Sequence, residues 1–207
     1  MILPLHDCII NKNTNIKPIW LMRQAGRYLP EFREIRKSNP NFVNLCLNES
    51  LSSQITLQPI KRFNLNAAII FSDILMVPYA LEQKLNFKKN FGPELGDINL
   101  ERLLNITEEE FINKLKPIYN SIKNTKSNYL LKNKNLIGFV GAPWTLLVYM
   151  INKKSPKSKI NNNFFKNINL INKVLKILDK YLKVHIENQI NNGADIIQIF
   201  DSWAGLV

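Results

Sequence analysis

Short apolar runs alternate along this chain with longer stretches in which apolar residues recur every three or four positions. The short runs are predicted to be β-strands, since they are brief and either apolar or rich in strand-forming residues. They lie at residues 18–22, 67–71, 136–140 and 195–200, with a weaker candidate at 84–87. Strands separated by helices are typical of βα units around a parallel sheet. The pattern therefore predicts an α/β fold.

Two of the longer stretches carry helical signals early in the chain. Residues 48–63 place apolar side chains at near-helical spacing. Thr107 and Glu110 form a capping box, which predicts the start of a second helix. We expect Pro117 to kink or end this second helix, because proline lacks the backbone N–H that a helix interior uses.

A long basic segment precedes the last predicted strand. Between residues 151 and 183 it holds nine lysines and only one acidic residue, Asp179, and we interpret the lysines as a solvated helix face. The opposite face carries an apolar stripe that should pack on the sheet: Ile171, Val174, Leu175, Leu178, Leu182 and Ile186. Gly193 is well placed to end this helix, and residues 152–163 are expected to form a mobile loop.

The composition is that of one globular domain. With 207 residues, 45% of them hydrophobic, the chain can bury a sizeable core, and no repeat or low-complexity linker divides it. We therefore predict a single domain over residues 1–207. The net charge of +12 makes an acidic ligand, a nucleic acid or a membrane surface conceivable as a partner, and charge alone does not choose among them.

The sequence predicts neither a membrane span nor secretion. The longest apolar run, residues 136–151, contains Pro143 and is shorter than the roughly 18 to 20 residues that cross a bilayer. The first residues lack the pattern of a secretory signal. Cys8 and Cys46 have no zinc-like spacing and are too few for a disulfide framework. We expect a soluble protein of the reducing cytoplasm.

Polar residues follow each of the four predicted strands. Ligands of parallel α/β proteins bind beyond the carboxyl ends of the strands, so we expect these residues to form one mixed polar pocket. They are Arg23, Gln24 and Arg27 after the first strand, Ser72 and Asp73 after the second, Trp144, Thr145 and Tyr149 after the third, and Asp201 and Ser202 after the fourth.

The two arginines suggest a substrate with several carboxylates. Arg23 and Arg27 flank an Ala-Gly pair that lets the backbone turn sharply. A guanidinium group stays charged at any working pH and binds a carboxylate through two parallel hydrogen bonds. The alternative is ordinary ion pairing with Glu31 or Glu34.

Asp73 directly follows a nearly continuous apolar strand, where a carboxylate needs donors or a cation to offset its desolvation. It is either a helix cap or a functional anion that stabilises positive charge developing during a reaction. Tyr149 and Ser202 are neutral hydrogen-bonding groups, which taken singly are more often structural.

Other classes of site find no support in the sequence. It contains no P-loop and no GxGxxG, HExxH or GxSxG motif, so neither a nucleotide site nor a serine hydrolase is indicated. The two histidines, His6 and His185, are far apart and have no convincing partners for a metal. We predict no metal site and interpret His185 as a surface or packing residue.

Four segments, in order along the chain, resemble signature blocks of the uroporphyrinogen decarboxylase family. They are PIWLMRQAGRYLPEFREIR at 18–36, TLQPIKRFNLNAAIIFSDIL at 56–75, GFVGAPWTLLVYM at 138–150 and QIFDSWAG at 198–205. The first is long and rare enough that chance is a poor explanation. The resemblance covers nearly the whole chain and corresponds to the N-terminal part of the family.

This resemblance implies a (β/α)8 barrel of the TIM type that acts as a homodimer. It also implies the conversion of the four acetate side chains of uroporphyrinogen III to methyl groups, giving coproporphyrinogen III without a cofactor or a metal. Neither a nucleic acid nor a membrane is an expected partner.

The resemblance also assigns residues by matching motif. It implies that Arg23 and Arg27 bind substrate carboxylates, one of them being a candidate proton donor, and that Gln24 lines the same turn. Asp73 matches the family's central carboxylate, which accepts hydrogen bonds from the pyrrole N–H groups and stabilises a cationic pyrrole. The matching substrate-contacting positions are Tyr149, Phe200 and Ser202.

Two departures from the family pattern stand out. An eight-stranded barrel needs about 250 residues, so this chain should form only its first four or five βα units. The family's C-terminal half, with an active-site histidine, has no counterpart here, which leaves the activity of this chain alone open. Glu82 stands where the family usually has a glycine, so the local turn is expected to differ.

The sequence leaves two alternative functions open. One is a related barrel enzyme, a zinc-dependent methyltransferase acting on a corrinoid or thiol. The other is a non-catalytic remnant that binds nucleic acid through the lysines of residues 151–183, although no binding motif accompanies them.

Overall fold

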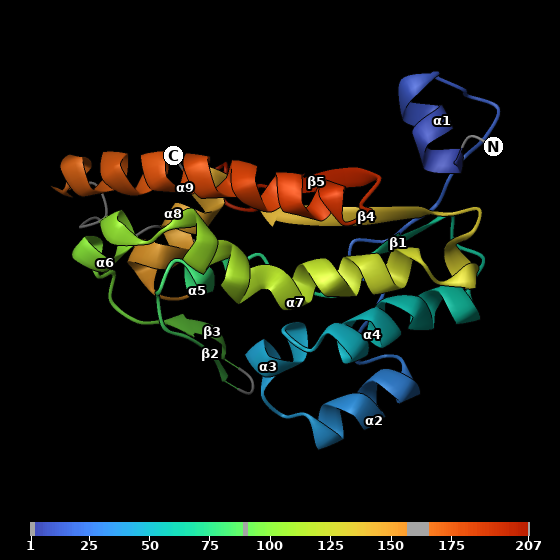
Figure 1. Cartoon of the computed structure of the whole chain (residues 1–207), viewed down its shortest axis with the longest axis horizontal. Helices are drawn as coiled ribbons and strands as arrows, with labels where there is room; N and C mark the ends of the chain where they lie inside the picture. Colours follow the sequence, from blue (N-terminus) through green and yellow to red (C-terminus); the bar gives the residue numbers. More distant parts are fainter. Residues whose placement is uncertain (1–2, 89–90, 157–165, 207) are drawn as a thin grey trace. The chain divides into compact units, whose positions relative to one another are not determined.

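The structure, a computed structural model, describes residues 3–88, 91–156 and 166–206 (Figure 1). Its helices are α1 (Pro4–Ile10), α2 (Pro30–Ser38), α3 (Phe42–Cys46), α4 (Glu49–Arg62), α5 (Met76–Ala80), α6 (Leu100–Asn105), α7 (Glu108–Lys126), the short η1 (Tyr129–Leu131), α8 (Pro143–Asn152) and α9 (Ile168–Asn191). Its strands are β1 (Ala67–Ile69), β2 (Leu85–Lys88), β3 (Gly92–Leu95), β4 (Asn135–Gly141) and β5 (Ile196–Phe200). Helices separate β1, β4 and β5 along the chain, as the sequence predicts for these strands.

Strands β1, β4 and β5 form one sheet in that order, and β1 is parallel to β4. At the start of β5, the Asp195 N–H donates to the Leu136 carbonyl at 2.8 Å. Beyond the other end of β4, the Ala142 N–H donates to the Phe200 carbonyl, also at 2.8 Å. Both strands therefore run in the same direction. The predicted parallel sheet is confirmed, as are three of its four strands.

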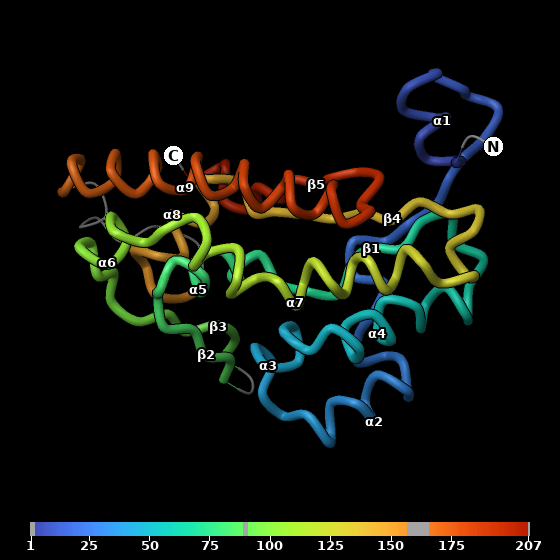
Figure 2. The backbone as a smooth tube through the Cα atoms, in the orientation of Figure 1, coloured from blue at the N-terminus to red at the C-terminus, as the bar shows by residue number. Residues whose placement is uncertain are grey.

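The first predicted strand is wrong, because residues 18–22 form no strand in the described part of the chain. The Asn66 N–H donates to the Ile19 carbonyl at 2.9 Å, and side chains supply two further hydrogen bonds to this segment. The Ile19 N–H donates to the Asn66 side-chain carbonyl at 2.8 Å, and the Leu21 N–H donates to the side-chain carbonyl of Gln24 at 2.8 Å. The chain consequently passes from α1 to α2 as an irregular connection (Figure 2).

The chain divides into two compact units. That the two units act together as a single domain over residues 1–207 stays a prediction. Unit 1 comprises Met1–Ser72, Lys116–Phe139 and Glu187–Gln198; unit 2 comprises Asp73–Leu115, Val140–Ile186 and Ile199–Val207. The weaker strand candidate at 84–87 is confirmed in unit 2 as β2, which pairs with β3 in an antiparallel hairpin.

In unit 1, α4 packs against the second half of α7 through buried hydroxyl groups. The Ser121 hydroxyl lies 2.9 Å from that of Ser52, and the Thr125 hydroxyl lies 2.9 Å from that of Ser53. The prediction that Pro117 could end its helix is wrong, because α7 continues through it to Lys126. The buried residues around it outweigh the backbone hydrogen bond that proline removes.

The other helix signals are confirmed. Asn48 caps α4 by accepting from a backbone N–H in its first turn, and Thr107 and Glu110 form the capping box of α7. The apolar stripe of α9 is largely buried, and Gly193 follows the helix with φ of 112°. The predicted loop at 152–163 overlaps residues 157–165, which lie outside the described residues. No helix in the described ranges is long and apolar enough to cross a membrane.

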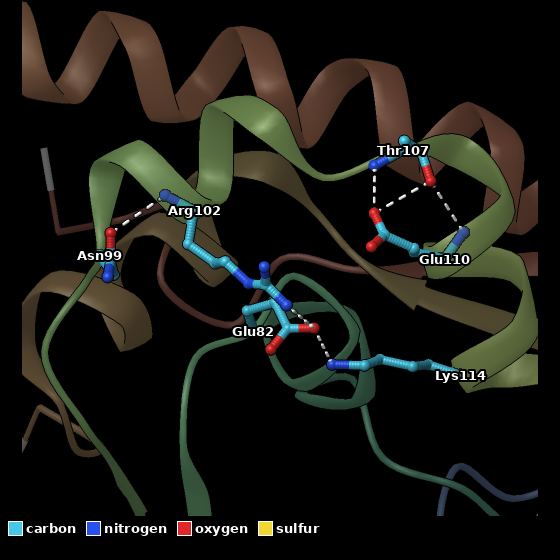
Figure 3. A network of polar contacts seen from close by, with 6 residues as sticks. All are labelled: Glu82, Asn99, Arg102, Thr107, Glu110 and Lys114. Carbon is cyan, nitrogen blue, oxygen red and sulfur yellow. Dashed lines mark hydrogen bonds and ion pairs between the residues drawn. The ribbon is translucent and has the colours of Figure 1, made fainter.

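Glu82, the residue that departs from the family pattern, has a left-handed backbone with φ of 71°. This is the region that glycine adopts without strain. Its carboxylate forms an ion pair with Lys114 and lies 3.9 Å from the Arg102 guanidinium (Figure 3). Unit 2 thus accommodates a side chain at this turn and connects it to α6 and α7.

Candidate active site

Unit 1 carries the segment that we call the arginine loop, residues 21–29. Gln24 lies at its centre and is only 1% exposed. Its side-chain N–H donates to the Ala67 carbonyl at 3.0 Å, while its side-chain carbonyl accepts from the Leu21 N–H at 2.8 Å. Both polar groups of this amide are therefore engaged with backbone groups.

Two further side chains hold the backbone of the arginine loop. The Arg33 guanidinium donates to the carbonyl groups of Arg27, at 2.9 Å, and Tyr28, at 3.1 Å. The Tyr28 hydroxyl donates to the carbonyl of Gln24. Sequence reasoning missed Arg33, since a side chain that binds backbone carbonyls leaves no residue pattern.

The two side chains of this loop that are candidates for binding a substrate are exposed to solvent. Arg23 and Arg27 are exposed, and neither guanidinium pairs with a carboxylate among the described residues. Glu31, one of the suggested partners, instead pairs with Arg62 at 2.6 Å. Burial, together with the positive charge of nearby Arg27, holds the pKa of Arg36 below its ordinary value. The loop is thus a site of excess positive charge, suited to an anion with more than one carboxylate.

In unit 2, Asp73 follows β1 and precedes α5. Its carboxylate accepts a hydrogen bond from the Leu75 N–H at 2.9 Å, an Asx-type turn at the entrance to α5. Asp73 does not cap α5, because the N-cap residue is Leu75 and no side chain caps that helix, so the helix-cap alternative for Asp73 is wrong. A Cβ atom placed on Gly141 would lie 3.1 Å from that of Ile74, so the Asp73 turn closely approaches the end of β4.

The segments that follow β4 and β5 are connected within unit 2. The Thr145 hydroxyl donates to the Asp201 carboxylate at 2.6 Å and accepts from the Trp203 N–H at 3.1 Å. The Trp144 indole donates to the Trp203 carbonyl at 3.1 Å. The sequence placed Trp144, Thr145 and Asp201 at strand ends without giving them roles, and Trp203 lies in the segment QIFDSWAG but was given no role either.

This connection brings two candidate substrate-contacting positions close in space. The Tyr149 ring lies edge-on to the Trp203 ring with 5.9 Å between centroids, and Ser202 directly precedes Trp203. Ser202 is exposed, whereas Tyr149 and Phe200 are half-buried. Unit 2 therefore carries a candidate carboxylate, phenol, phenyl ring and hydroxyl group.

His185 lies apart from these strand-end residues in its contacts. His185 lies on α9, where burial lowers its pKa to about 3, so it is neutral at pH 7. Its ring meets the Phe111 ring edge-on at 6.5 Å, as expected of a packing residue. Within the described ranges, no three His, Cys, Asp or Glu side chains cluster as metal ligands would.

Fold and strand-end residues together define an α/β protein with polar groups at the carboxyl ends of parallel strands. A methyltransferase from Methanosarcina mazei has a similar structure, with a TM-score of 0.68 over 91% of this chain and 56% of that protein. Their sequences are 13% identical, so this likeness concerns the fold alone.

Sequence comparison is more specific. Residues 5–207 match the uroporphyrinogen decarboxylase (URO-D) family. The chain is 44% identical over 202 residues to the uroporphyrinogen decarboxylase of Campylobacter jejuni subsp. jejuni serotype O:2, covering 96% of this chain and 59% of that protein. It is 40% identical over 200 residues to that of Rickettsia felis, covering 96% and 58%. The chain belongs to the uroporphyrinogen decarboxylase family, and it spans somewhat under 60% of the length of these relatives.

Proposed function

We propose that this chain forms part of a decarboxylase that converts the four acetate side chains of uroporphyrinogen III to methyl groups, giving coproporphyrinogen III. The observation that carries the proposal is the pair of exposed arginines, Arg23 and Arg27, which have no carboxylate partner among the described residues. Their place in a chain of this family supports the assignment of a polycarboxylate substrate.

The reaction suits the side chains of this chain. Protonation of an electron-rich pyrrole carbon makes the ring an electron sink. Carbon dioxide can then leave from the adjacent acetate, and the substrate itself supplies what a cofactor would. The protein must orient a polyanion, balance its charge and stabilise the cationic ring.

Each candidate residue has a role in this proposal. Arg23 and Arg27 bind substrate carboxylates, and one of them is the candidate proton donor. Asp73 accepts hydrogen bonds from the pyrrole N–H groups and stabilises the cationic intermediate. Tyr149, Phe200 and Ser202 contact the substrate.

The finer architecture is proposed on the same grounds. The protein is a (β/α)8 barrel whose first four or five βα units this chain supplies, and the full-length form is a homodimer in the cytoplasm. Unit 1 and unit 2 together would form the single domain.

The test is an anaerobic incubation with uroporphyrinogen III and an assay for coproporphyrinogen. It compares this chain with a version extended to the length of its relatives. We expect product from the extended version, and a loss of at least a hundredfold in kcat when Asp73→Asn removes the anion. Asp179→Asn, which removes an exposed carboxylate on α9, is the matched control and should retain full activity.

A folded extended version that forms no product would contradict the decarboxylase assignment. Bound zinc in that version, with methyl transfer to a thiol, would then favour the methyltransferase alternative.

A further inference from the structure

A side-chain amide takes the place of a backbone partner beside β1. The carboxamide of Gln24 contains the same donor and acceptor as a peptide group. It accepts from the N–H of Leu21 and donates to the carbonyl of Ala67, the first residue of β1. These are the two interactions that a peptide group makes when it lies between two extended segments.

We propose that Gln24 is a positioning residue, which anchors the arginine loop to β1 and thereby sets the directions in which Arg23 and Arg27 leave the backbone. The proposal rests on the proposed function, since it assumes that these arginines bind carboxylates. It assigns Gln24 to the loop's internal structure and not to contact with the substrate.

The position of Gln24 in the loop supports this role. It directly follows Arg23 and precedes Arg27 by three residues. Its backbone is therefore continuous with Arg23, while its side chain is fixed to the first residue of β1. Any rotation of the loop about its ends would break one or both of its hydrogen bonds.

Burial argues against a direct contact between Gln24 and the substrate. The residue is 1% exposed, in contrast to the exposed Arg23 and Arg27 on either side. A substrate oxygen could reach its amide only by displacing a backbone partner, which would leave a buried polar group unsatisfied.

The remaining contacts of the loop act on the same backbone. The Tyr28 hydroxyl donates to the carbonyl of Gln24 itself, and Arg33 donates to the carbonyls of Arg27 and Tyr28. Tyr28 and Arg33 are exposed, so water can replace their hydrogen bonds. Gln24 supplies the buried anchor, and its loss should have the larger effect.

The experiment measures two properties of this chain in parallel. Amide hydrogen exchange reports whether residues 21–29 keep the hydrogen bonds of the folded arginine loop. Binding of uroporphyrin III, the stable oxidised form of the octacarboxylate ring system, reports whether Arg23 and Arg27 are positioned to bind carboxylates. For Gln24→Leu, we expect the Leu21 amide to exchange at least tenfold faster and uroporphyrin to bind about tenfold more weakly. Exchange in α4 should be unchanged, which shows that unit 1 remains folded.

Gln24→Glu distinguishes positioning from the filling of space. The introduced carboxylate can still accept from Leu21, but it faces the Ala67 carbonyl without a proton to donate. Protonation restores the donor. The affinity of this variant, relative to the parent chain at the same pH, should therefore rise as the pH falls from 8 to 5.5. A residue that only fills space would leave Gln24→Leu with the affinity of the parent chain, whatever the pH dependence of Gln24→Glu, whose ionised carboxylate also repels the ligand.

The outcomes separate the inference from the function on which it rests. If the parent chain binds uroporphyrin and both Gln24 variants bind equally well, the positioning role is wrong and the proposed function stands. If the parent chain binds no better than an Arg23→Gln, Arg27→Gln double variant, the proposed function fails for this chain, and the positioning role fails with it. Unchanged exchange at Leu21 in Gln24→Leu would overturn the anchor by itself.

Discussion

The two units hold their candidate residues in different ways. Around the arginine loop of unit 1, the buried support is the neutral Gln24 amide, and the Tyr28 hydroxyl and the Arg33 guanidinium support the backbone from exposed positions. The two arginines that are candidates for binding substrate are charged and exposed.

In unit 2, a carboxylate helps to connect the segments that follow β4 and β5, because Asp201 accepts a hydrogen bond from Thr145. The nearby candidate substrate-contacting residues, Tyr149 and Ser202, are neutral. The buried support in unit 1 is thus uncharged, so a charged ligand can bind the exposed arginines without competing for the hydrogen bonds of Gln24.

The largest expected effect comes from removing the charge of the arginine loop. In the extended protein, Arg23→Gln with Arg27→Gln should weaken binding of uroporphyrinogen III by roughly a hundredfold or more, because each charge-assisted hydrogen bond contributes about 1.5–3 kcal/mol. Arg102→Gln removes an exposed arginine from α6 in unit 2 and is the control. A similar loss in both proteins would mean that net charge matters and the loop does not.

A second prediction concerns the buried imidazole of unit 2. The folded-state pKa of His185 is about 3, below the ordinary value of about 6.5 expected in the unfolded chain. The unfolded state therefore takes up a proton first as the pH falls, and stability present above pH 6.5 is lost progressively toward pH 3. Between pH 7 and pH 5 the free energy of unfolding should fall by about 2 kcal/mol from this group.

The measurement is urea unfolding at several pH values, with His185→Leu as the comparison. The leucine variant should lack the histidine's share of the pH dependence, so the free energy of unfolding of the parent, minus that of the variant, should fall by about 2 kcal/mol between pH 7 and pH 5. Parallel curves would mean that the pKa of His185 is not lowered in the folded protein. The neutral hydroxyl pairs between α4 and α7 in unit 1 have no such dependence, which sharpens the contrast between the units.

The third prediction breaks the connection that follows β4 and β5. Thr145→Val keeps the shape of the side chain and removes the hydroxyl that joins Asp201 to the Trp203 backbone. The free energy of unfolding should fall by about 1–2 kcal/mol, because Thr145 is buried and its partners lose a hydrogen bond. The near-ultraviolet circular dichroism of the Tyr149–Trp203 pair should also weaken. Thr14→Val, at an exposed position, should change stability by less than about 0.5 kcal/mol.

What the sequence could predict depended on whether local pattern and tertiary environment agreed. β1, β4 and β5 are short apolar runs that the fold pairs in one parallel sheet, so their pattern was sufficient. Residues 18–22 look equally strand-like, but the Gln24 amide takes the position of a partner there, and periodicity does not reveal a side chain that bonds to backbone. Pro117 was misleading for a related reason, because the packing of α7 outweighs its local preference.

The candidate site divides in the same way. The residues at the strand ends could be named from the sequence, since position after a strand is a local property. The side chains that support these residues could not be named from the sequence. Arg33 donates to backbone carbonyls, and Thr145 forms hydrogen bonds with residues more than fifty positions away in the chain. Family resemblance gave roles to Arg23 and Asp73, and the geometry of the supports came only from the fold.

The smallest expected effect is on the free energy of unfolding, and it comes from substitutions of Glu82. Here the prediction is the sign of the difference between two variants. With φ of 71°, the residue has a conformation that costs about 1–2 kcal/mol for a side chain bearing a Cβ atom and little for glycine. Glu82→Ala keeps this strain and loses the ion pair with Lys114, so it should destabilise unit 2 by up to about 1 kcal/mol.

Glu82→Gly loses the same ion pair but relieves the strain, so it should be more stable than Glu82→Ala by about 1 kcal/mol, even though glycine gains more freedom in the unfolded chain. The pair is compared by thermal or urea unfolding, and both variants lack the carboxylate, so electrostatics cancel in the difference. An alanine variant as stable as the glycine variant would show that the turn relaxes out of the left-handed region once the Lys114 contact is gone. The ion pair, and not the path of the chain, would then be what imposes the conformation of Glu82.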